Sequence, residues 1–287
     1  MQRSPVRHCL SSFMEPVLTS RPPHVRAFWK PNVSHREPPP TYAAEVRALP
    51  DRSAPPLWDT LQIATYNVHR WTGPRGGDAW LPERAVALIA SLDADVIGLQ
   101  EVLRPTHHED PLPHLADALG YHVAFVASRQ HRNGILGNAL LSRWAFDDAL
   151  AVDLSFSRFE QRVAVAVELD APTPLAFAAT HLALIDRTRK RQVEALLSHP
   201  SLQGPTVLMG DLNAWRRRGA ASRRLAAAFE TRHHNQRWPP SYPSSGPILA
   251  LDRIYARGAQ LLNLRTVSTA AAKMASDHLP VVGDLVL

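Results

Sequence analysis

The sequence contains a single cysteine, Cys9, among its 287 residues. One cysteine excludes an intramolecular disulfide and a zinc site built from cysteine thiolates. The chain also lacks any run of about 20 apolar residues, so no helix is expected to span a membrane. Its first residues are basic but are interrupted by Pro5, His8 and Glu15, and they therefore lack the continuous apolar segment of a signal peptide. These absences predict a cytoplasmic protein.

Lysine is also scarce, because it occurs only at positions 30, 190 and 273 and arginine supplies the rest of the 32 basic residues. Together with 26 acidic residues this gives a net charge of +6. A basic chain suits a phosphate-bearing partner such as nucleic acid or an anionic lipid surface. A composition rich in arginine and alanine is also typical of GC-rich coding, so the charge alone does not identify the partner.

Proline is concentrated at the start of the chain, where residues 1–58 hold 11 of the 25 prolines. Proline cannot donate to a strand ladder or continue a helix. We therefore expect residues 1–58 to form a disordered tail that pairs no strands, and a functional arm that contacts substrate or a partner is the alternative. Residues 59–287 then form the domain, because a chain that is 45% hydrophobic supports one large core.

From Leu61 onward, short runs of Val, Ile and Leu alternate with helical patterns and turn residues. Strands are predicted at 61–68, 95–100, 121–126, 138–142, 161–169, 175–181, 205–210, 251–256, 263–268 and 280–287, and helices at 82–92, 111–119, 187–198 and 219–229. So many strands with few helices exceed a simple doubly wound sheet. The expected fold class is α/β (α+β), a four-layer α/β/β/α sandwich in which two mixed sheets pack face to face with helices outside.

Polar residues that can bind metal or move protons recur where apolar strands end, which is where layered α/β folds build their sites. Asn67 follows the strand in LQIATYNVHRW, and Glu101 closes the apolar strand in ADVIGLQEV. Each has an ordinary alternative. Asn67 could be a turn residue bonded to its own backbone, and Glu101 could be the ion-pair partner of an arginine.

The same placement recurs further along the chain. His181 lies inside the apolar run LAFAATHLAL, where a core histidine with satisfied hydrogen bonds is the alternative. In TVLMGDLNAW, Asp211 and Asn213 are expected to project on the same side of an extended segment. Asp252 lies within ILALDRIYARG, and His278 precedes the last strand in ASDHLPVVGDLVL. An aspartate in one strand near a histidine at the start of the next would tune the imidazole as an acid or a base.

The ordered motifs YNVH, LQEV, GNALLSR, THL, GDLNAW, YPSSGP with LDRIY, and SDHLPV resemble those of the endonuclease/exonuclease/phosphatase superfamily. That superfamily includes deoxyribonuclease-I-like nucleases, abasic-site endonucleases, neutral sphingomyelinases and inositol-polyphosphate phosphatases. The resemblance covers residues 60 to 287. It implies the fold already expected and a metal-dependent phosphoric ester hydrolase.

The resemblance implies a Mg²⁺ or Mn²⁺ ion that is held chiefly by Glu101 with help from Asn67 and polarises a phosphoryl oxygen. Asp277 would complete this metal site or a second one. Carboxylate and amide oxygens suit these ions better than zinc. Asp211 and Asn213 would orient or deprotonate the attacking water.

By the same resemblance, Asp252 and His278 form a dyad that activates water or stabilises the transition state, and His181 contacts the phosphate or the leaving group. Either Asp211 or His278 serves as the base. A cation, fixed donors and one positioned water together lower the barrier that a phosphodiester presents to anionic nucleophiles.

Loops between the motifs are expected to contact the substrate. The candidate substrate-binding residues are Asn138, Arg143 and Trp215, and the neighbouring basic residues are Arg129, His131, Arg132 and Arg216 to Arg218. Basic residues beside an aromatic ring suit single-stranded nucleic acid or a lipid headgroup surface. A solvated charged face is the alternative for the arginine run.

Two positions depart from patterns found in the superfamily. His69 stands where several of its nucleases carry an acidic residue, and His181 stands where the abasic-site enzymes have a tyrosine. The forms THL and YNVHR resemble the sphingomyelinase-like bacterial branch instead. We therefore expect a monomeric phosphodiesterase acting on a lipid headgroup or small phosphodiester, with peripheral membrane contact. The alternatives are a DNA or RNA nuclease, and a catalytically silent binding module on the same scaffold.

Overall fold

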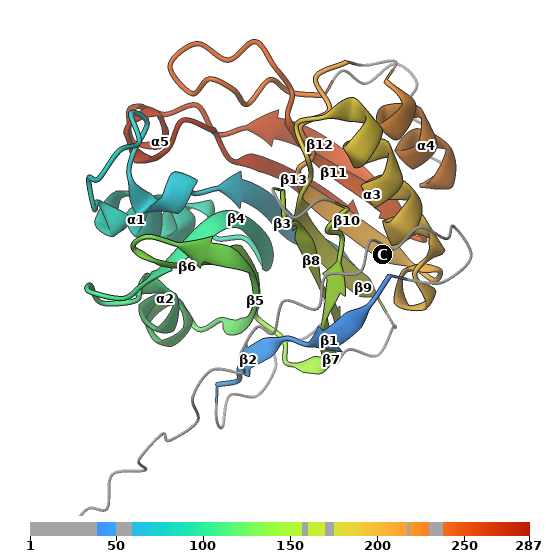
Figure 1. Ribbon diagram of the computed structural model, residues 1–287, viewed down its shortest axis with the longest axis horizontal. Helices are drawn as coiled ribbons and strands as arrows, with labels where there is room; N and C mark the ends of the chain where they lie inside the picture. The colour runs from blue at the N-terminus through green and yellow to red at the C-terminus, as the bar shows by residue number, and fades with distance from the viewer. Residues whose placement is uncertain (1–38, 50–58, 157–159, 170–174, 217–218, 230–237) are drawn as a thin grey trace, which may run out of the picture. The chain divides into compact units, whose positions relative to one another are not determined.

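Two mixed β-sheets form the centre of the protein (Figure 1). The computed structural model describes residues 39–49, 59–156, 160–169, 175–216, 219–229 and 238–287. They belong to one compact unit, Pro31–Leu287, and the other unit, Met1–Lys30, lies outside the described residues. Among the described residues, no helix is long and apolar enough to cross a membrane.

One sheet has six strands in the order β1-β7-β8-β9-β10-β11, and the other has seven in the order β12-β13-β3-β4-β6-β5-β2. The strands of the first are β1 (Thr41–Ala43), β7 (Phe146–Asp153), β8 (Val163–Leu169), β9 (Ala176–His181), β10 (Thr206–Asp211) and β11 (Asp252–Arg257). Those of the second are β12 (Gln260–Thr266), β13 (Val281–Val286), β3 (Thr60–Asn67), β4 (Val96–Pro105), β6 (Gly134–Ser142), β5 (His122–His131) and β2 (Glu45–Arg47).

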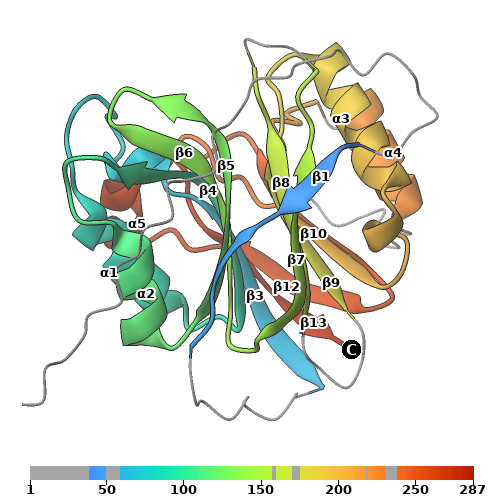
Figure 2. The same ribbon diagram turned by 60° about the horizontal axis from the view of Figure 1, so that its bottom comes forward.

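Helices cover the outer face of each sheet (Figure 2). On the seven-stranded sheet lie α1 (Pro82–Leu92), α2 (Pro111–Leu119) and α5 (Ala270–Ala275), and on the six-stranded sheet lie α3 (Asp186–Ser198) and α4 (Ala220–Ala228). Two short 3₁₀ turns, η1 (His69–Trp71) and η2 (Pro200–Leu202), complete the elements. The expected four-layer sandwich is confirmed.

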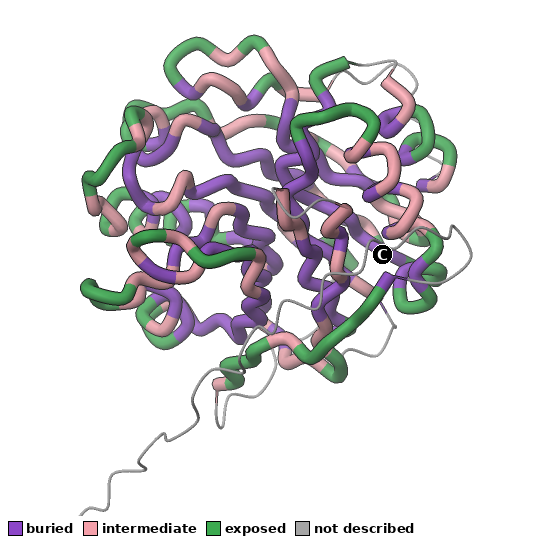
Figure 3. The backbone as a smooth tube through the Cα atoms, viewed as in Figure 1, coloured by how far each residue is buried: buried purple, intermediate pink, exposed green. Residues whose placement is uncertain are grey.

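Alternation along the strands produces three apolar layers. In β4, Val96 packs between the sheets whereas Ile97 packs under the helices of the seven-stranded sheet. In β10, Met209 packs between the sheets whereas Leu208 faces α3 and α4. Figure 3 shows the consequence, since the strand interiors are buried and exposure is concentrated in helices and connecting loops. Two sheets buried on both faces form a rigid base for the loops at their ends.

Each sheet contains one parallel pair of strands. β3 and β4 are parallel with α1 between them in the chain, and β9 and β10 are parallel with α3 between them. All other pairings are antiparallel. Because the carboxyl ends of parallel strands meet at the same edge, the residues that end β3, β4, β9 and β10 are candidates for one shared site.

Two of the helices have the residue bounds that the sequence predicts. α1 begins with Pro82 in its first turn and ends before Asp93, which has a left-handed φ of 46°. α2 begins after Asp110, whose side chain accepts a hydrogen bond from the Leu112 backbone N–H, and ends at the left-handed Gly120. Proline at the first position and a left-handed residue after the last are general helix signals.

The expectation that residues 1–58 pair no strands is wrong for residues 41–47. β1 pairs with β7 and β2 pairs with β5, each at the edge of its sheet. Both are exposed three-residue strands, and their hydrogen bonds go to strands about a hundred residues away, which local sequence cannot reveal. The remaining prediction for the tail concerns residues 1–38 and 50–58, which lie outside the described residues. β7 and α5 were also not predicted.

Candidate active site

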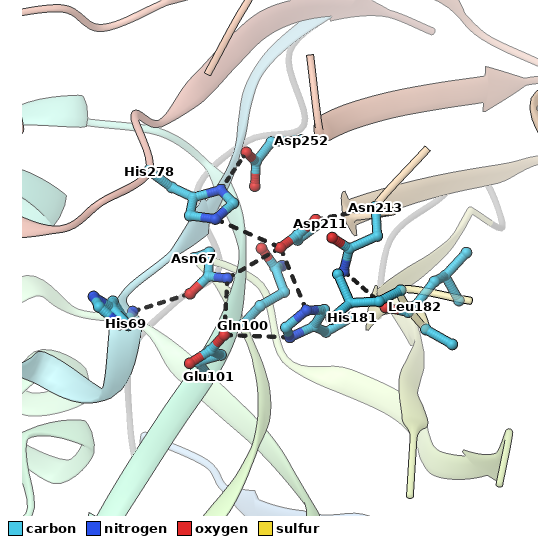
Figure 4. A network of polar contacts seen from close by, with 12 residues as sticks. Asn67, His69, Gln100, Glu101, His181, Leu182, Asp211, Asn213, Asp252 and His278 are labelled. Atoms are coloured by element: carbon cyan, nitrogen blue, oxygen red, sulfur yellow. Dashed lines mark hydrogen bonds and ion pairs between the residues drawn. The ribbon is translucent and has the colours of Figure 1, made fainter. Parts of the chain in front are cut away.

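Side chains from both sheets meet at the carboxyl ends of the parallel strand pairs (Figure 4). In the six-stranded sheet Asp211 is the register partner of His181 on β9 and of Asp252 on β11. In the seven-stranded sheet Asn67, which ends β3, is the register partner of Gln100 on β4. The predicted strand-end residues therefore converge from the two sheets on one place.

Glu101 reaches this place through an irregularity in β4. The register of β4 against β6 shifts between Leu99 and Val102, and Glu101 has a left-handed φ of 52°. A non-glycine residue rarely adopts this conformation, which is found at bulges and functional sites. The bulge brings the Glu101 carboxylate to 3.4 Å from the Asn67 amide nitrogen. Arg70 is its ion-pair neighbour at 3.6 Å.

The Asp211 carboxylate is the centre of the cluster. Its Oδ2 lies 3.2 Å from Asn67 Nδ2, 3.4 Å from His181 Nε2 and 3.7 Å from His278 Nε2. Asp211 is buried, so these donors replace the water that a carboxylate otherwise requires. Because the backbone N–H of His69 donates to Asn67 Oδ1 at 3.0 Å, the amide nitrogen of Asn67 faces the two carboxylates.

Asp252 and His278 form the predicted dyad. His278 Nδ1 lies 2.7 Å from Asp252 Oδ2, which also accepts a 2.5 Å hydrogen bond from the Ser241 hydroxyl. Burial alone would lower the pKa of His278, but the carboxylates of Asp252 and Asp211 outweigh it and raise that pKa to about 10. The imidazole is therefore protonated at neutral pH, and its Nε2–H points toward Asp211.

His181 has the opposite protonation state. Burial and the positive charge of Arg162 lower the pKa of His181 to about 3, although Asp211 acts against them. Its two ring nitrogens face carboxylates, with Nε2 at 3.4 Å from Asp211 and Nδ1 at 3.8 Å from Glu101. A neutral imidazole donates from one nitrogen only, so His181 can donate to one of these carboxylates at a time.

The expectation that Asn213 continues an extended segment beside Asp211 is wrong. β10 ends at Asp211, and Asn213 has a left-handed φ of 48°. Its backbone N–H donates to Asp211 Oδ1 at 3.0 Å, and its side-chain nitrogen donates to the Leu182 carbonyl at 2.9 Å. Asn213 thus fixes the turn after β10 against the end of β9.

Two more carboxylates provide oxygen atoms for a cation. Asp277 lies 3.2 Å from His69 Nδ1 and 3.3 Å from the Ser276 hydroxyl. Burial raises the pKa of Asp277, and the negative charge of Glu101 raises it further. Oδ1 of Asp252 is buried without a hydrogen-bond partner, and Asp211 and Asp252 offer carboxylate oxygens that lie within 4.8 Å of each other. An oxygen-rich, negatively charged cluster of this kind fits a divalent cation such as Mg²⁺ or Mn²⁺.

The three predicted substrate-binding residues lie in different places. Asn138 is buried, and its amide nitrogen donates to the Val163 carbonyl at 2.9 Å, which ties the two sheets together. Trp215 is exposed in the loop after β10, with the Arg216 guanidinium 4.6 Å from its ring centre. Arg217 and Arg218 lie outside the described residues.

Arg143 is not brought to the cluster. Its guanidinium lies 2.5 Å from Asp93 and 3.4 Å from Asp95, which precede the first residue of β4. Glu101 lies six residues after Asp95, or roughly 20 Å along an extended strand. The sequence shows that GNALLSR is a strand but not that its last residue lies at the opposite end of the sheet.

Sequence reasoning did not identify several residues that support the cluster. Ser241 holds Asp252, the Ser276 hydroxyl donates to the Asn67 carbonyl at 2.7 Å, and Arg162 brings positive charge near His181. Ser241 directly precedes the motif YPSSGP, and Ser276 is the first residue of SDHLPV. Arg162 has no such signal, because it is one of many arginines and its position depends on the fold.

Comparisons with known proteins show the family of the chain. Residues 64–278 match the model of the Endonuclease/Exonuclease/phosphatase family. The Escherichia coli K12 protein YbhP is 26% identical over 245 residues, which cover 79% of this chain and 96% of YbhP.

Solved structures show the same fold. An endonuclease/exonuclease/phosphatase from Beutenbergia cavernae superposes with a TM-score of 0.62 at 24% identity, over 79% of this chain and 72% of that chain. The human Nocturnin catalytic domain with bound sulfate superposes with a TM-score of 0.61 at 22% identity, over 84% and 96%. With the family match, these findings show that the chain belongs to the endonuclease/exonuclease/phosphatase family of phosphoester hydrolases.

Proposed function

We propose that the protein is a divalent-metal-dependent phosphodiesterase that acts on a lipid headgroup or a small phosphodiester. The observation that carries this proposal is the Asp211 carboxylate, which lies between a neutral imidazole, His181, and a protonated one, His278. A site that combines a proton acceptor with a positively charged donor can both activate water and stabilise the charge on phosphate.

Each residue has a role that follows from its contacts. Asp211 takes the proton of the attacking water, because His278 is already protonated and the lowered pKa of His181 makes that imidazole a weak base. His278 donates from Nε2 to a phosphate oxygen, and Asp252 keeps it charged and oriented through the 2.7 Å contact. His181 contacts the phosphate or the leaving group, and Asn213 positions Asp211 through its backbone N–H.

Glu101 and Asp277 would hold the divalent cation, and Asn67 would ligate it only if its amide turned its oxygen away from His69. The cation, when bound, withdraws electron density from the phosphoryl group and neutralises charge that develops on it. The oxygen donors of this site favour Mg²⁺ or Mn²⁺.

Exposed apolar residues around the cluster support a lipid substrate. Leu184 and Ile185, in the loop after His181, are 68% and 62% exposed, and Trp215 and Ile248 are 52% and 78% exposed. A Cβ added at Gly219 would lie 3.6 Å from Asp186 Oδ1, so the loops that carry Ile185 and Trp215 lie close to each other. We call Leu184, Ile185, Trp215 and Ile248 the apolar rim.

The apolar rim also carries positive charge. Arg187 and Arg216 are exposed beside Ile185 and Trp215. Apolar side chains flanked by arginines suit the interface of a membrane that contains anionic lipids. We propose that the rim brings the site to a lipid headgroup as a peripheral contact. Cytoplasmic location and the monomeric state stay predictions.

A nuclease is the second candidate function, and the Trp215–Arg216 pair favours it. An exposed tryptophan under a guanidinium is also a platform for stacking an unpaired base. The catalytic cluster would serve either substrate, because both present a phosphodiester.

A substrate comparison tests the proposal. Purified protein with Mg²⁺ or Mn²⁺ is incubated with vesicles of sphingomyelin and phosphatidylglycerol, with supercoiled plasmid, and with bis-p-nitrophenyl phosphate. We expect hydrolysis of bis-p-nitrophenyl phosphate and of at least one lipid, and no nicking of plasmid at low salt. Nicked plasmid with intact lipids would establish the nuclease instead. Inactivity on every substrate with both metals would favour a silent binding module.

A further inference from the structure

The turn that follows Asn67 has an unusual backbone. His69, Arg70 and Trp71 have positive φ values of 46°, 58° and 62°. Three consecutive non-glycine residues in the left-handed region are costly, and such a turn persists only when its surroundings hold it. Trp71 is buried and its ring N–H donates to the Leu103 carbonyl at 2.9 Å, while the Thr72 hydroxyl donates to the His69 carbonyl at 2.6 Å. The turn is therefore firmly anchored.

The anchored turn places Arg70 beside the catalytic cluster. His69 Nδ1 donates to the Gly73 carbonyl at 2.9 Å, which leaves Nε2 to accept from an Arg70 terminal nitrogen at 2.8 Å. Arg70 Nε is buried and lies 3.6 Å from Glu101 Oε2, so this nitrogen faces Glu101 and the terminal nitrogens are the donors available to a ligand. His69 thus orients the Arg70 guanidinium through one of its terminal nitrogens.

Arg70 also lines a cleft next to the cluster. The cleft is bordered by Arg70, Trp80, His108, His131 and Asn133. The Trp80 and His108 rings are stacked with their centres 5.0 Å apart. The only acidic residue among those that line it is Asp78, which is ion-paired with Arg132. The cleft therefore offers cationic and neutral donors without an unpaired carboxylate.

We propose that this cleft is a subsite for a second anionic group of the substrate, a phosphate monoester carried on the alcohol next to the scissile phosphodiester. The proposal rests on the proposed phosphodiesterase function and defines its substrate class. Arg70 binds the second phosphate through its terminal nitrogens, because a guanidinium suits the recognition of phosphate oxygens. His131 and Asn133, which also line the cleft, supply further donors, and His69 is a positioning residue for Arg70.

The binding test needs no turnover. sn-Glycerol 3-phosphate is titrated into the protein in EDTA by calorimetry, with glycerol as the uncharged comparison. Without a cation, the four carboxylates of Glu101, Asp211, Asp252 and Asp277 outweigh the single positive charge of His278, so the catalytic cluster disfavours a phosphate dianion. We expect glycerol phosphate to bind and glycerol not to bind.

Variants locate the binding. Arg70→Gln is expected to weaken glycerol phosphate binding at least tenfold, Arg70→Lys to weaken it less, and Arg84→Gln, an exposed arginine on α1, to leave it unchanged. Tryptophan fluorescence should change on binding, and Trp80→Phe should remove that change. Equal binding by wild type and Arg70→Gln would overturn the proposal, as would equal binding of glycerol.

A kinetic test separates this inference from the proposed function. Two p-nitrophenyl phosphodiesters are compared, one esterified to glycerol and the other to glycerol 3-phosphate. Wild type is expected to have a kcat/KM at least tenfold higher for the second, through a lower KM, and Arg70→Gln is expected to abolish that preference. An unchanged preference in Arg70→Gln would overturn the subsite alone. Absence of turnover on both would overturn the proposed function, while the calorimetric result would still decide whether the cleft binds phosphate.

Discussion

His278 Nδ1 and Asp252 Oδ2 lie 2.7 Å apart across the junction of the two sheets. Asp252 begins β11 in the six-stranded sheet, and His278 precedes β13 in the seven-stranded sheet. Because the sheets are packed rigidly against each other, this contact is set by the core and not by a mobile loop. Asp252 keeps the buried imidazole of His278 protonated, and this positive charge can bind a phosphate in the site.

Asp252→Asn should move the pH dependence of hydrolysis. The wild-type pKa of His278 is raised to about 10, so activity that needs the imidazolium persists through neutral pH and falls as pH rises through that value. The variant lacks the charge of Asp252, so the pKa of His278 drops and the fall begins at lower pH. We expect a reduction of about 100-fold in kcat/KM near neutral pH.

The measurement is a pH profile of kcat/KM on bis-p-nitrophenyl phosphate, with Asp117→Asn, an exposed aspartate on α2, as the control. A profile of unchanged shape in Asp252→Asn would contradict the role of the dyad.

The raised pKa of His278 also stabilises the fold. The protonated imidazole contributes fully to the free energy of unfolding below the unfolded-state pKa of 6.5. This contribution is lost as pH rises through the folded-state pKa of about 10.

His181 should make the protein sensitive to acid. The folded-state pKa of His181 is lowered to about 3 from 6.5. Below pH 6.5 the unfolded chain therefore binds a proton that the folded protein does not bind, and the free energy of unfolding falls as pH drops. The slope from one such group is at most about 1.4 kcal/mol per pH unit. His181→Gln should therefore lose less stability between pH 7 and pH 5 than wild type.

Urea unfolding at the two pH values checks this, with His114→Gln on the exposed face of α2 as the comparison. An equal loss in His181→Gln and wild type would contradict it.

Gly210→Ala should destabilise both the fold and the site. Gly210 has a φ of 146°, and a Cβ added there would lie 1.9 Å from the Thr180 carbonyl oxygen. The backbone of β9 or β10 must shift, which displaces His181 and Asp211. We expect a loss of roughly 2 to 4 kcal/mol in the free energy of unfolding. Gly204→Ala, where an added Cβ meets nothing within 4 Å, is the control, and denaturant midpoints measure both. Similar midpoints for the two variants would show that β9 and β10 have more room than the structure indicates.

The apolar rim predicts a difference between vesicle and soluble substrates. Leu184→Ser combined with Ile185→Ser should lower the ratio of turnover on phosphatidylglycerol vesicles to turnover on bis-p-nitrophenyl phosphate by at least fivefold. The reason is that the two side chains no longer enter the membrane interface. Val46→Ser, another exposed apolar residue on the edge strand β2, is the control. A ratio that stays at the wild-type value in the double variant would contradict the proposal that the apolar rim enters the membrane interface.

Much of the fold could be predicted because its signals are local. Pro82 and the stripe of α1, or Asp110 and Gly120 around α2, lie within one element and do not depend on distant partners. The convergence of Asn67, Glu101 and Asp211 could also be predicted, since strand ends meet at the edge of a parallel pair. Elements without a local signal were missed, such as β1 and β2, which exist through pairing with β7 and β5.

The site departs from the sequence-based prediction where geometry depends on distant packing. Nothing local shows that Arg143 points to the opposite end of β4 or that Asn213 turns into the left-handed region. The turn of His69, Arg70 and Trp71 contains no glycine or asparagine, which are the residues that would indicate positive φ values in the sequence. It is held by the contact of Trp71 with Leu103, which only the folded chain provides.

The most direct test of the phosphodiesterase site is hydrolysis of bis-p-nitrophenyl phosphate with Mg²⁺ or with EDTA by wild type, Glu101→Ala and His278→Ala. Glu101 contributes the carboxylate from the bulge of β4, and His278 contributes the positive charge of the dyad, so the two variants remove different parts of the site. The account predicts turnover that EDTA abolishes and that each variant lowers by at least about 100-fold. Turnover that persists in EDTA, or that is unchanged in both variants, would mean that the reaction takes place elsewhere on the protein.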